Sequence, residues 1–158
     1  MSRVQLALNV SNLDAAVEFY SKLFDTEVNK RKPGYANFAI AEPPLKLVLI
    51  EGEGGGTLNH LGVEVETADE VEAAEQRLSN DGVATTGVDD TVCCYALKTE
   101  TWVADPDGAP WEVYVKTGDA DQMTNTVLGD GDNAQCCAPA ATQTVSIGAT
   151  PEAAGGCC

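Results

Sequence analysis

The chain has 158 residues, 44% of them hydrophobic, and its 9 Lys and Arg face 25 Asp and Glu, giving a formal net charge of −16. This length can bury the core of one domain and leaves room for an extension. The negative field repels phosphate, which excludes nucleic acid and anionic membrane surfaces as partners. We recognise no signal peptide and no apolar stretch long enough to span a membrane, so we expect a reduced cytoplasmic protein.

The first half of the chain predicts one helix among four strands. Residues 4–10 alternate between apolar and polar side chains, as a half-buried strand does. The polar pair at residues 11–12 then starts a helix whose apolar residues share one face. Further strands are predicted around Val28, over residues 36–41 and over residues 45–50. The predicted order of elements is βαβββ.

The second half repeats this order after three consecutive glycines at residues 54–56. Thr67 and Glu70 have the spacing of a capping box, which opens the second helix. Four strands are predicted around that helix, over residues 58–65, 83–88, 99–104 and 110–115. A repeat of this length is typical of a fold built from two similar modules.

Two βαβββ modules, at about residues 1–52 and 57–117, can pair their sheets into one curved cup with a helix outside each. The predicted fold class is therefore α+β. Residues 118–158 contain no aromatic residue and no Lys or Arg, so they have little to bury and are predicted to be a flexible tail. Four aromatic residues of the predicted strands either line a substrate cavity in the cup or form plain core, namely Phe38, Trp102, Trp111 and Tyr114.

All six cysteines occur as adjacent pairs, namely Cys93-Cys94, Cys136-Cys137 and Cys157-Cys158. Adjacent Cα atoms are about 3.8 Å apart, which would strain a disulfide within a pair. Two adjacent thiolates suit a soft centre such as trivalent arsenic, cadmium, mercury or zinc. Bridges between pairs and a structural zinc site are the alternatives, although bridges suit short secreted chains and zinc usually needs C-x-x-C spacing. The first pair lies in residues 89–98, which have little apolar periodicity and are predicted to be a loop.

Three polar residues are predicted to face the inside of the cup. Period-two alternation places Gln5, His60 and Glu112 opposite the apolar residues of their strands. An imidazole, a carboxylate and one further polar ligand are typical of a divalent transition-metal site such as non-haem Fe(II). Taken singly, His60 reads as a core histidine and Glu112 as a surface carboxylate.

Several segments together resemble the vicinal oxygen chelate superfamily, which includes glyoxalase I and extradiol dioxygenases. They are residues 1–10, 32–40, 45–49, 57–63 and 111–114, with the Asp-Pro-Asp-Gly turn at residues 105–108. Within the superfamily, the chain is most similar to organoarsenical carbon–arsenic lyases and the related cadmium-induced proteins. The resemblance runs from residue 1 to about residue 117 and includes Cys93-Cys94.

The resemblance implies an activity: Fe(II) and O2 are used to cleave the carbon–arsenic bond of trivalent methyl or aromatic arsenicals, which leaves arsenite. By position, Gln5, His60 and Glu112 would hold the iron, and Cys93 and Cys94 would bind arsenic. Many members have His where this chain has Gln5, and an amide oxygen is a weaker ligand than imidazole. The implied partner is a small trivalent organoarsenical.

Two other functions fit parts of the pattern. A thiol-based protein that binds or sequesters arsenic or cadmium would explain the cysteine pairs without catalysis. An extradiol-type dioxygenase would use the metal site and leave Cys93-Cys94 idle. The two tail pairs are either mobile ligands or have no role.

Overall fold

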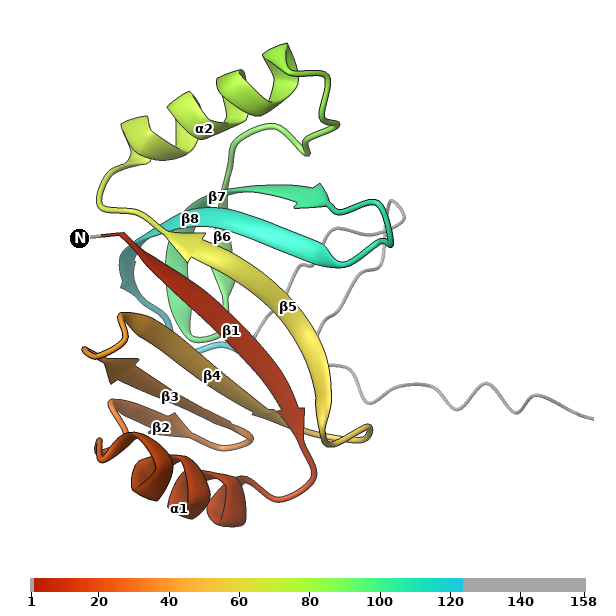
Figure 1. The fold of residues 1–158 in the computed structure, drawn as a ribbon. Helices are drawn as coiled ribbons and strands as arrows, with labels where there is room; N and C mark the ends of the chain where they lie inside the picture. Colours follow the sequence, from red (N-terminus) through yellow and green to blue (C-terminus); the bar gives the residue numbers. More distant parts are fainter. Residues whose placement is uncertain (1, 124–158) are drawn as a thin grey trace, which may run out of the picture.

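Two βαβββ units follow one another along the chain in the computed structural model, which describes residues 2–123 (Figure 1). The first unit consists of β1 (Arg3–Val10), α1 (Leu13–Phe24), β2 (Lys30–Lys32), β3 (Tyr35–Ile40) and β4 (Leu45–Glu51). The second consists of β5 (Thr57–Glu64), α2 (Ala68–Asn80), β6 (Asp89–Cys93), β7 (Ala96–Ala104) and β8 (Pro110–Asp119). The predicted repeat is confirmed.

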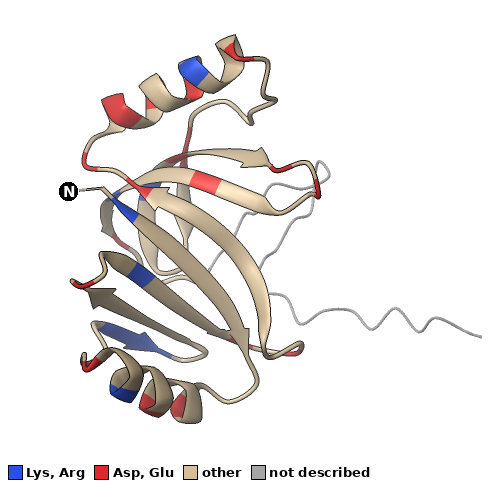
Figure 2. Ribbon diagram, viewed as in Figure 1, with Lys and Arg blue, Asp and Glu red and all other residues tan. Residues whose placement is uncertain are grey.

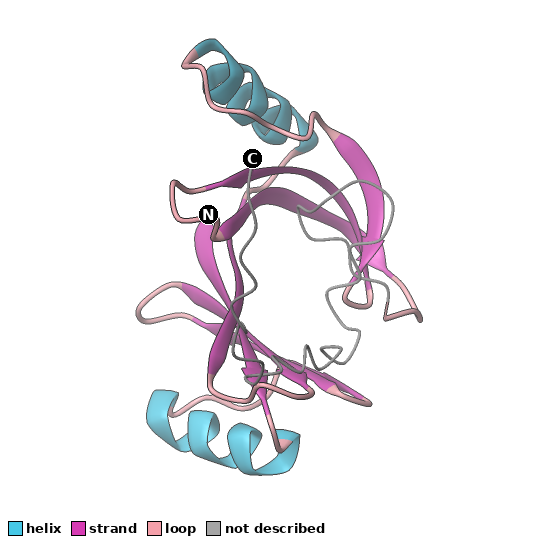
Figure 3. Ribbon diagram, turned by 90° about the vertical axis from the view of Figure 1, so that its right-hand side faces the viewer, coloured by secondary structure: helices cyan, strands magenta, loops and turns pink. Residues whose placement is uncertain are grey.

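One eight-stranded sheet contains all the strands, in the order β2-β3-β4-β1-β5-β8-β7-β6. Antiparallel pairing of β1 with β5 joins the two units, while β1 pairs with β4, and β5 with β8, in parallel. The sheet curls around an open interior, and both helices lie on its outer side (Figure 3). The α+β cup predicted from the repeat is confirmed.

Both helices begin at the predicted caps. Asn12 accepts a hydrogen bond from the backbone N–H of Ala15, and Thr67 and Glu70 form the complete capping box. The apolar face of α1 packs on the outer side of β1, β3 and β4, where Leu13, Phe38 and Leu47 are buried. No helix within residues 2–123 is both long enough and apolar enough to cross a membrane.

The prediction was wrong for residues 83–98. No strand forms over residues 83–88, and the predicted loop at residues 89–98 is instead strand β6, a two-residue turn and the start of β7. Strand β6 begins with two aspartates, so it lacks the apolar alternation by which a strand is recognised. Pairing with β7 stabilises β6 despite this lack of apolar alternation, and Thr99 donates a hydrogen bond of 2.6 Å to Asp90. The strand predicted around Val28 also lies slightly later, at β2.

The last strand continues past the boundary predicted at residue 117, to Asp119. Two further backbone hydrogen bonds form after the end of β8. Ala120 donates to the Tyr95 carbonyl, and Tyr95 donates to the carbonyl of Gln122. Residues 118–123 therefore lie beside the turn that carries Cys94. The rest of the predicted tail, with its two cysteine pairs, lies outside the described residues.

The capping box of α2 gives a stability prediction. Thr67→Ala removes the side chain that satisfies the backbone N–H of Glu70, and we expect the free energy of unfolding to fall by about 1 kcal/mol. Urea denaturation measures this change. The matched control, Thr117→Ala at an exposed position of β8, should change stability by less than about 0.5 kcal/mol. Equal effects of the two substitutions would contradict the capping assignment.

Candidate metal and dithiol site

Gln5, His60 and Glu112 come together inside the cup, as the alternation predicts. Gln5 pairs with Gly62 on β5, and Gly62 pairs with Glu112 on β8, so neighbouring strands carry the three side chains. The Gln5 Nε2 atom lies 3.0 Å from His60 Nε2 and contacts Glu112 Oε1, and the last two atoms are 3.4 Å apart. All three residues are at most 2% exposed.

The Glu112 carboxylate is divided between two neighbours. Its Oε2 atom accepts a 2.7 Å hydrogen bond from Lys98 Nζ, while Oε1 faces His60 and Gln5. Burial raises the pKa of a carboxyl, but the Lys98 ammonium outweighs burial and lowers the pKa of Glu112 to about 2. Glu112 is therefore ionised at neutral pH, with Oε1 available as a ligand.

A β-bulge positions the His60 ring. Strand β1 pairs Ala7 with His60 but Leu8 with Leu58, so Asn59 is an extra residue in β5. The Oδ1 atom of Asn59 lies 2.7 Å from His60 Nδ1. Since an amide oxygen can only accept, His60 carries its proton on Nδ1 and leaves the Nε2 lone pair facing Gln5 and Glu112. This second hydrogen bond is typical of histidines that bind metals.

Gln5 is held by a chain of polar groups. Its Oε1 accepts a hydrogen bond of 2.6 Å from the Tyr114 hydroxyl, which in turn accepts one of 2.8 Å from Lys46. The amide NH2 therefore faces His60 and Glu112. A metal ion would need the Gln5 oxygen, not the nitrogen, to face His60 and Glu112. Metal binding therefore requires the Gln5 amide group to flip.

The donor set fits a divalent metal of the iron or manganese type: one neutral imidazole nitrogen, one ionised carboxylate oxygen and one amide oxygen. In the described part of the chain, no group of three His, Cys, Asp or Glu side chains is arranged to hold a metal. A metal held here by three protein side chains would use an amide oxygen as its third ligand, and Gln5 is the amide that contacts His60 and Glu112.

Gly62 makes room for the Glu112 side chain. A Cβ atom at residue 62 would lie 2.8 Å from Glu112 Cγ and 3.2 Å from its Oε1. Real Cβ atoms do not approach other atoms so closely, so only glycine leaves the carboxylate where it stands. Residue 62 is therefore glycine because the Glu112 side chain needs the space, and not because the strand itself requires glycine.

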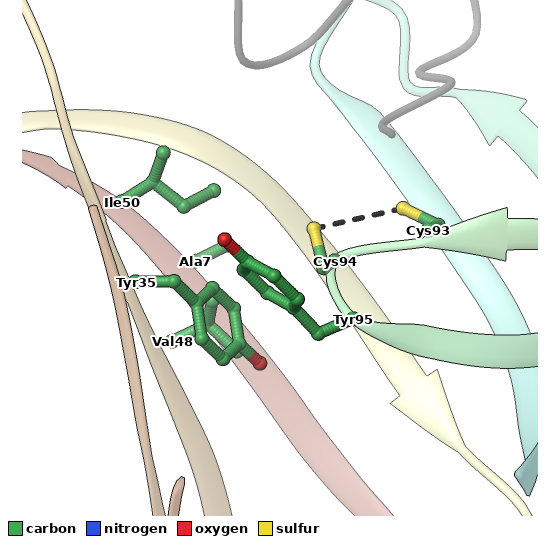
Figure 4. Close-up of a cluster of buried hydrophobic side chains, with 7 residues drawn as sticks. All are labelled: Ala7, Tyr35, Val48, Ile50, Cys93, Cys94 and Tyr95. Atoms are coloured by element: carbon green, nitrogen blue, oxygen red, sulfur yellow. Dashed lines mark hydrogen bonds between the residues drawn. The ribbon is translucent and has the colours of Figure 1, made fainter. Parts of the chain in front are cut away.

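The Cys93-Cys94 pair reaches the same cavity from the β6–β7 hairpin. Cys93 ends β6 and Cys94 begins the turn, and the two Sγ atoms are 3.6 Å apart, much farther than the length of a disulfide bond (Figure 4). Both residues are at most 7% exposed. A cavity of about 120 Å³ is lined by Cys94 together with Gln5 and His60.

The turn that carries the dithiol has an unusual backbone. Cys94 and Tyr95 both have positive φ, at 52° and 60°, as a two-residue type I′ hairpin turn requires. Tyr95 holds the turn against the first unit, because its ring lies 5.5 Å from the Tyr35 ring and its hydroxyl donates to the Pro33 carbonyl (Figure 4). The Tyr95 carbonyl also accepts a hydrogen bond of 2.9 Å from Lys30.

The four aromatic residues predicted to line a cavity or to form plain core have different surroundings. Tyr114 is part of the site, and the Trp102 ring lies edge-on to His60 with 5.5 Å between ring centres. Phe38 belongs to the core under α1 and also borders the cavity. Trp111 follows the opposite parity from Glu112 and is not part of the cavity lining among the described residues.

The sequence reasoning missed Lys98, Asn59 and Lys46 as residues of this site. Lys98 was assigned to a loop, and alternation could place it only once β7 was known to begin at Ala96. Asn59 reaches the ring through a bulge, which breaks the period of two. Lys46 follows the alternation of β4, but its contact with Tyr114 depends on how distant strands face each other across the cup.

Residues 3–113 match the family model of the Glyoxalase/Bleomycin resistance protein/Dioxygenase superfamily, and the chain belongs to this superfamily. A trivalent organoarsenical cleaving enzyme of Thermomonospora curvata is 57% identical over 141 residues, covering 88% of this chain and 90% of that protein. The cadmium-induced protein CadI of Mycobacterium tuberculosis is 52% identical over 142 residues, covering 87% of this chain and 93% of CadI.

Solved structures agree on the fold. An extradiol ring-cleaving dioxygenase from B. fuscum superposes with a TM-score of 0.56 at 20% identity, over 77% of this chain and 34% of that one. The Mn(II)-bound glyoxalase of Novosphingobium aromaticivorans superposes with a TM-score of 0.54 at 17% identity, over 78% of this chain and 44% of that one. The vicinal oxygen chelate fold expected from the resemblance is confirmed.

The contact between Gly62 and Glu112 gives a second prediction. Gly62→Ala forces the carboxylate away from His60, and we expect affinity for Fe(II) or Mn(II) to fall at least tenfold because the ligands no longer converge. Anaerobic metal titration measures it, with circular dichroism as the check of folding. In the control Gly52→Ala the new Cβ meets nothing within 4 Å, so affinity should be unchanged. Parent-like affinity of a folded Gly62→Ala variant would argue against this site.

Proposed function

We propose that the protein cleaves the carbon–arsenic bond of trivalent organoarsenicals with Fe(II) and O2, releasing arsenite. One observation carries the proposal: Cys94, Gln5 and His60 line one cavity. Cys93 Sγ lies 3.6 Å from Cys94 Sγ, and Glu112 contacts both Gln5 and His60. Two relatives that cover most of the chain, at 57% and 38% identity, are named as trivalent organoarsenical cleaving enzymes, which supports the substrate class.

The residues divide the work between holding the substrate and holding the metal. Cys93 and Cys94 bind arsenic as a dithiolate: two As–S bonds replace two As–OH bonds, and each thiol proton leaves with a hydroxide as water, so no charged group on the substrate is needed. Gln5, His60 and Glu112 would hold Fe(II), which would supply the activation of O2. Lys98 keeps Glu112 ionised and fixes which carboxylate oxygen is free.

Burial contributes to the chemistry by excluding water. Both cysteines and all three proposed metal ligands are at most 7% exposed. Holding the arsenic and its carbon next to the metal site makes the reaction effectively intramolecular, which can lower a barrier by about 7–11 kcal/mol in favourable cases. The hairpin fixes the dithiol, and the sheet fixes the metal ligands.

The activity is tested directly by aerobic incubation of the Fe(II)-loaded protein with methylarsonous acid, followed by chromatographic analysis for arsenite. Arsenite formation that requires both Fe(II) and O2 is the expected result. Stoichiometric arsenic binding without arsenite would identify a sequestration protein instead. Cleavage of a catechol without cleavage of the arsenical would identify an extradiol-type dioxygenase.

A third prediction separates metal binding from arsenic binding. His60→Ala or Glu112→Ala should abolish stoichiometric Fe(II) binding and turnover, because each removes one of three protein ligands. Both variants should still bind one trivalent arsenical per chain through the dithiol. Elemental analysis after gel filtration measures iron and arsenic together. Full iron retention by both folded variants would contradict the ligand assignment.

A fourth prediction separates the cysteine pairs in the full-length chain. Cys93→Ser or Cys94→Ser should abolish turnover, since one thiolate cannot chelate arsenic. The matched control replaces Cys136, Cys137, Cys157 and Cys158 by Ser together, and this variant should keep kcat at saturating substrate. Its apparent KM should rise if the tail thiols pass arsenic to Cys93-Cys94. Loss of kcat in the control would place the tail cysteines in the catalytic step.

A further inference from the structure

Basic side chains gather around the cavity of a strongly acidic protein. Five of the nine Lys and Arg residues of the chain line it, namely Arg3, Lys30, Lys46, Lys98 and Lys116. Among the described residues, Glu64 is the one acidic residue of the lining, although the chain contains 25 Asp and Glu. Figure 2 shows Lys and Arg along β2 and in β1 and β4, whereas the two helices carry Asp and Glu together with Lys22 and Arg77. The local charge is thus opposite to the net charge.

The carboxylates near these cations are too few to neutralise them. Glu64 is shared by Arg3, at 2.6 Å, and Lys46, at 3.7 Å. In the same way Asp119 pairs with both Lys30 and Lys116.

Lys98 faces Glu112 at 2.7 Å and Glu100 at 3.8 Å, and burial raises the pKa of Glu100. Four carboxylates therefore serve five cations. Within residues 2–123, these carboxylates leave the cavity with an excess of at least one positive charge.

Of the two buried lysines of the lining, Lys46 is the one without a carboxylate at hydrogen-bond distance. It is only 8% exposed, and its Nζ donates one hydrogen bond, of 2.8 Å, to the Tyr114 hydroxyl. The Glu64 carboxylate at 3.7 Å is beyond hydrogen-bond distance, while an ammonium has three donors. Burial with so little compensation lowers the pKa of Lys46 to about 8. An anion in the cavity would stabilise this ammonium.

We propose that the cavity binds trivalent organoarsenicals whose carbon substituent carries a carboxylate, with Lys46 as the cation that receives it. The inference rests on the proposed function, in which Cys94 holds arsenic in the same cavity that Lys46 lines. A small thiol bound to the arsenic could also carry a carboxylate, but Cys93 and Cys94 displace such a thiol when they bind arsenic. The carbon substituent stays on the arsenic, so it must be the group that carries the carboxylate. A volume of about 120 Å³ is smaller than the roughly 150 Å³ of a cavity that holds benzene, so the cavity suits a short carboxyalkyl group better than a ring.

The test measures binding to the full-length, metal-free protein, so it does not depend on cleavage. The probes are 4-carboxyphenyl- and 4-carbamoylphenylarsonous acid, whose substituents have nearly the same size and shape but differ in charge. The pair of carboxymethyl- and ethylarsonous acid repeats the comparison with small groups. We expect the carboxylated member to bind about tenfold more tightly in at least one pair, the size of a charge-assisted hydrogen bond. Equilibrium dialysis with arsenic analysis gives the dissociation constants.

The residue assignment is tested with Lys46→Met, which keeps the length of the side chain and removes its charge. This variant should lose the preference for the carboxylate. The control Lys22→Met removes an equal charge from the exposed face of α1, and it should retain the preference. A folded Lys46→Met variant that keeps the full preference would overturn the role of Lys46.

The parent protein keeps the proposal falsifiable even if Lys46→Met does not fold. Equal affinities within both probe pairs would overturn the carboxylate site, whatever the protein does to methylarsonous acid. A clear preference in a protein that cleaves no arsenical would instead reject the proposed function and leave the anion site standing. The two failures are therefore distinguishable.

Discussion

The antiparallel pairing of β1 with β5 is the contact on which both the cup and its site depend. It joins the two βαβββ units into one sheet, and it brings Gln5 beside Gly62 and so beside Glu112. Gln5 and His60 occupy equivalent places in the two units, each two residues before a small residue of the same strand. That small residue pairs in parallel with Val48 in the first unit and with Glu112 in the second. The repeat thus offers two equivalent positions, and only one of them has a carboxylate.

The site also shows how buried charge is managed in this fold. Lys98 and Glu112 are almost fully buried, and removing two charges from water carries a penalty of several kcal/mol for each ion. Their 2.7 Å contact offsets part of that penalty, and a metal ion at Glu112 Oε1 would offset more. Lys46 lacks such a close partner. The lining of the cavity is therefore rich in cations, although the chain as a whole carries a formal net charge of −16.

Sequence alone could predict the parts of the structure that depend on local periodicity. The alternation of β1, β5 and β8 is regular near Gln5, His60 and Glu112, and their inward orientation follows from it. Alternation does not identify β6, whose first residues are polar. This strand lies at the sheet edge and is stabilised by pairing with β7. The polar partners of the site were missed for a different reason. Lys98 lies in the segment predicted as a loop, so its contact with Glu112 could not be inferred before β7 was known to begin at Ala96. The contact of Lys46 with Tyr114 joins β4 and β8, which are far apart in sequence, so it depends on the curvature of the sheet.

The hairpin that presents the dithiol illustrates a constraint that no local pattern encodes. Type I′ turns favour Asn and Gly, yet here Cys94 and Tyr95 occupy both positive-φ positions, at a cost of about 1–3 kcal/mol each. Contacts of Tyr95 with Tyr35 and with the Pro33 carbonyl hold the turn from the opposite unit. A glycine in place of Tyr95 would relieve the backbone but lose these contacts. The strained turn therefore holds Cys94 at the cavity that Gln5 and His60 also line.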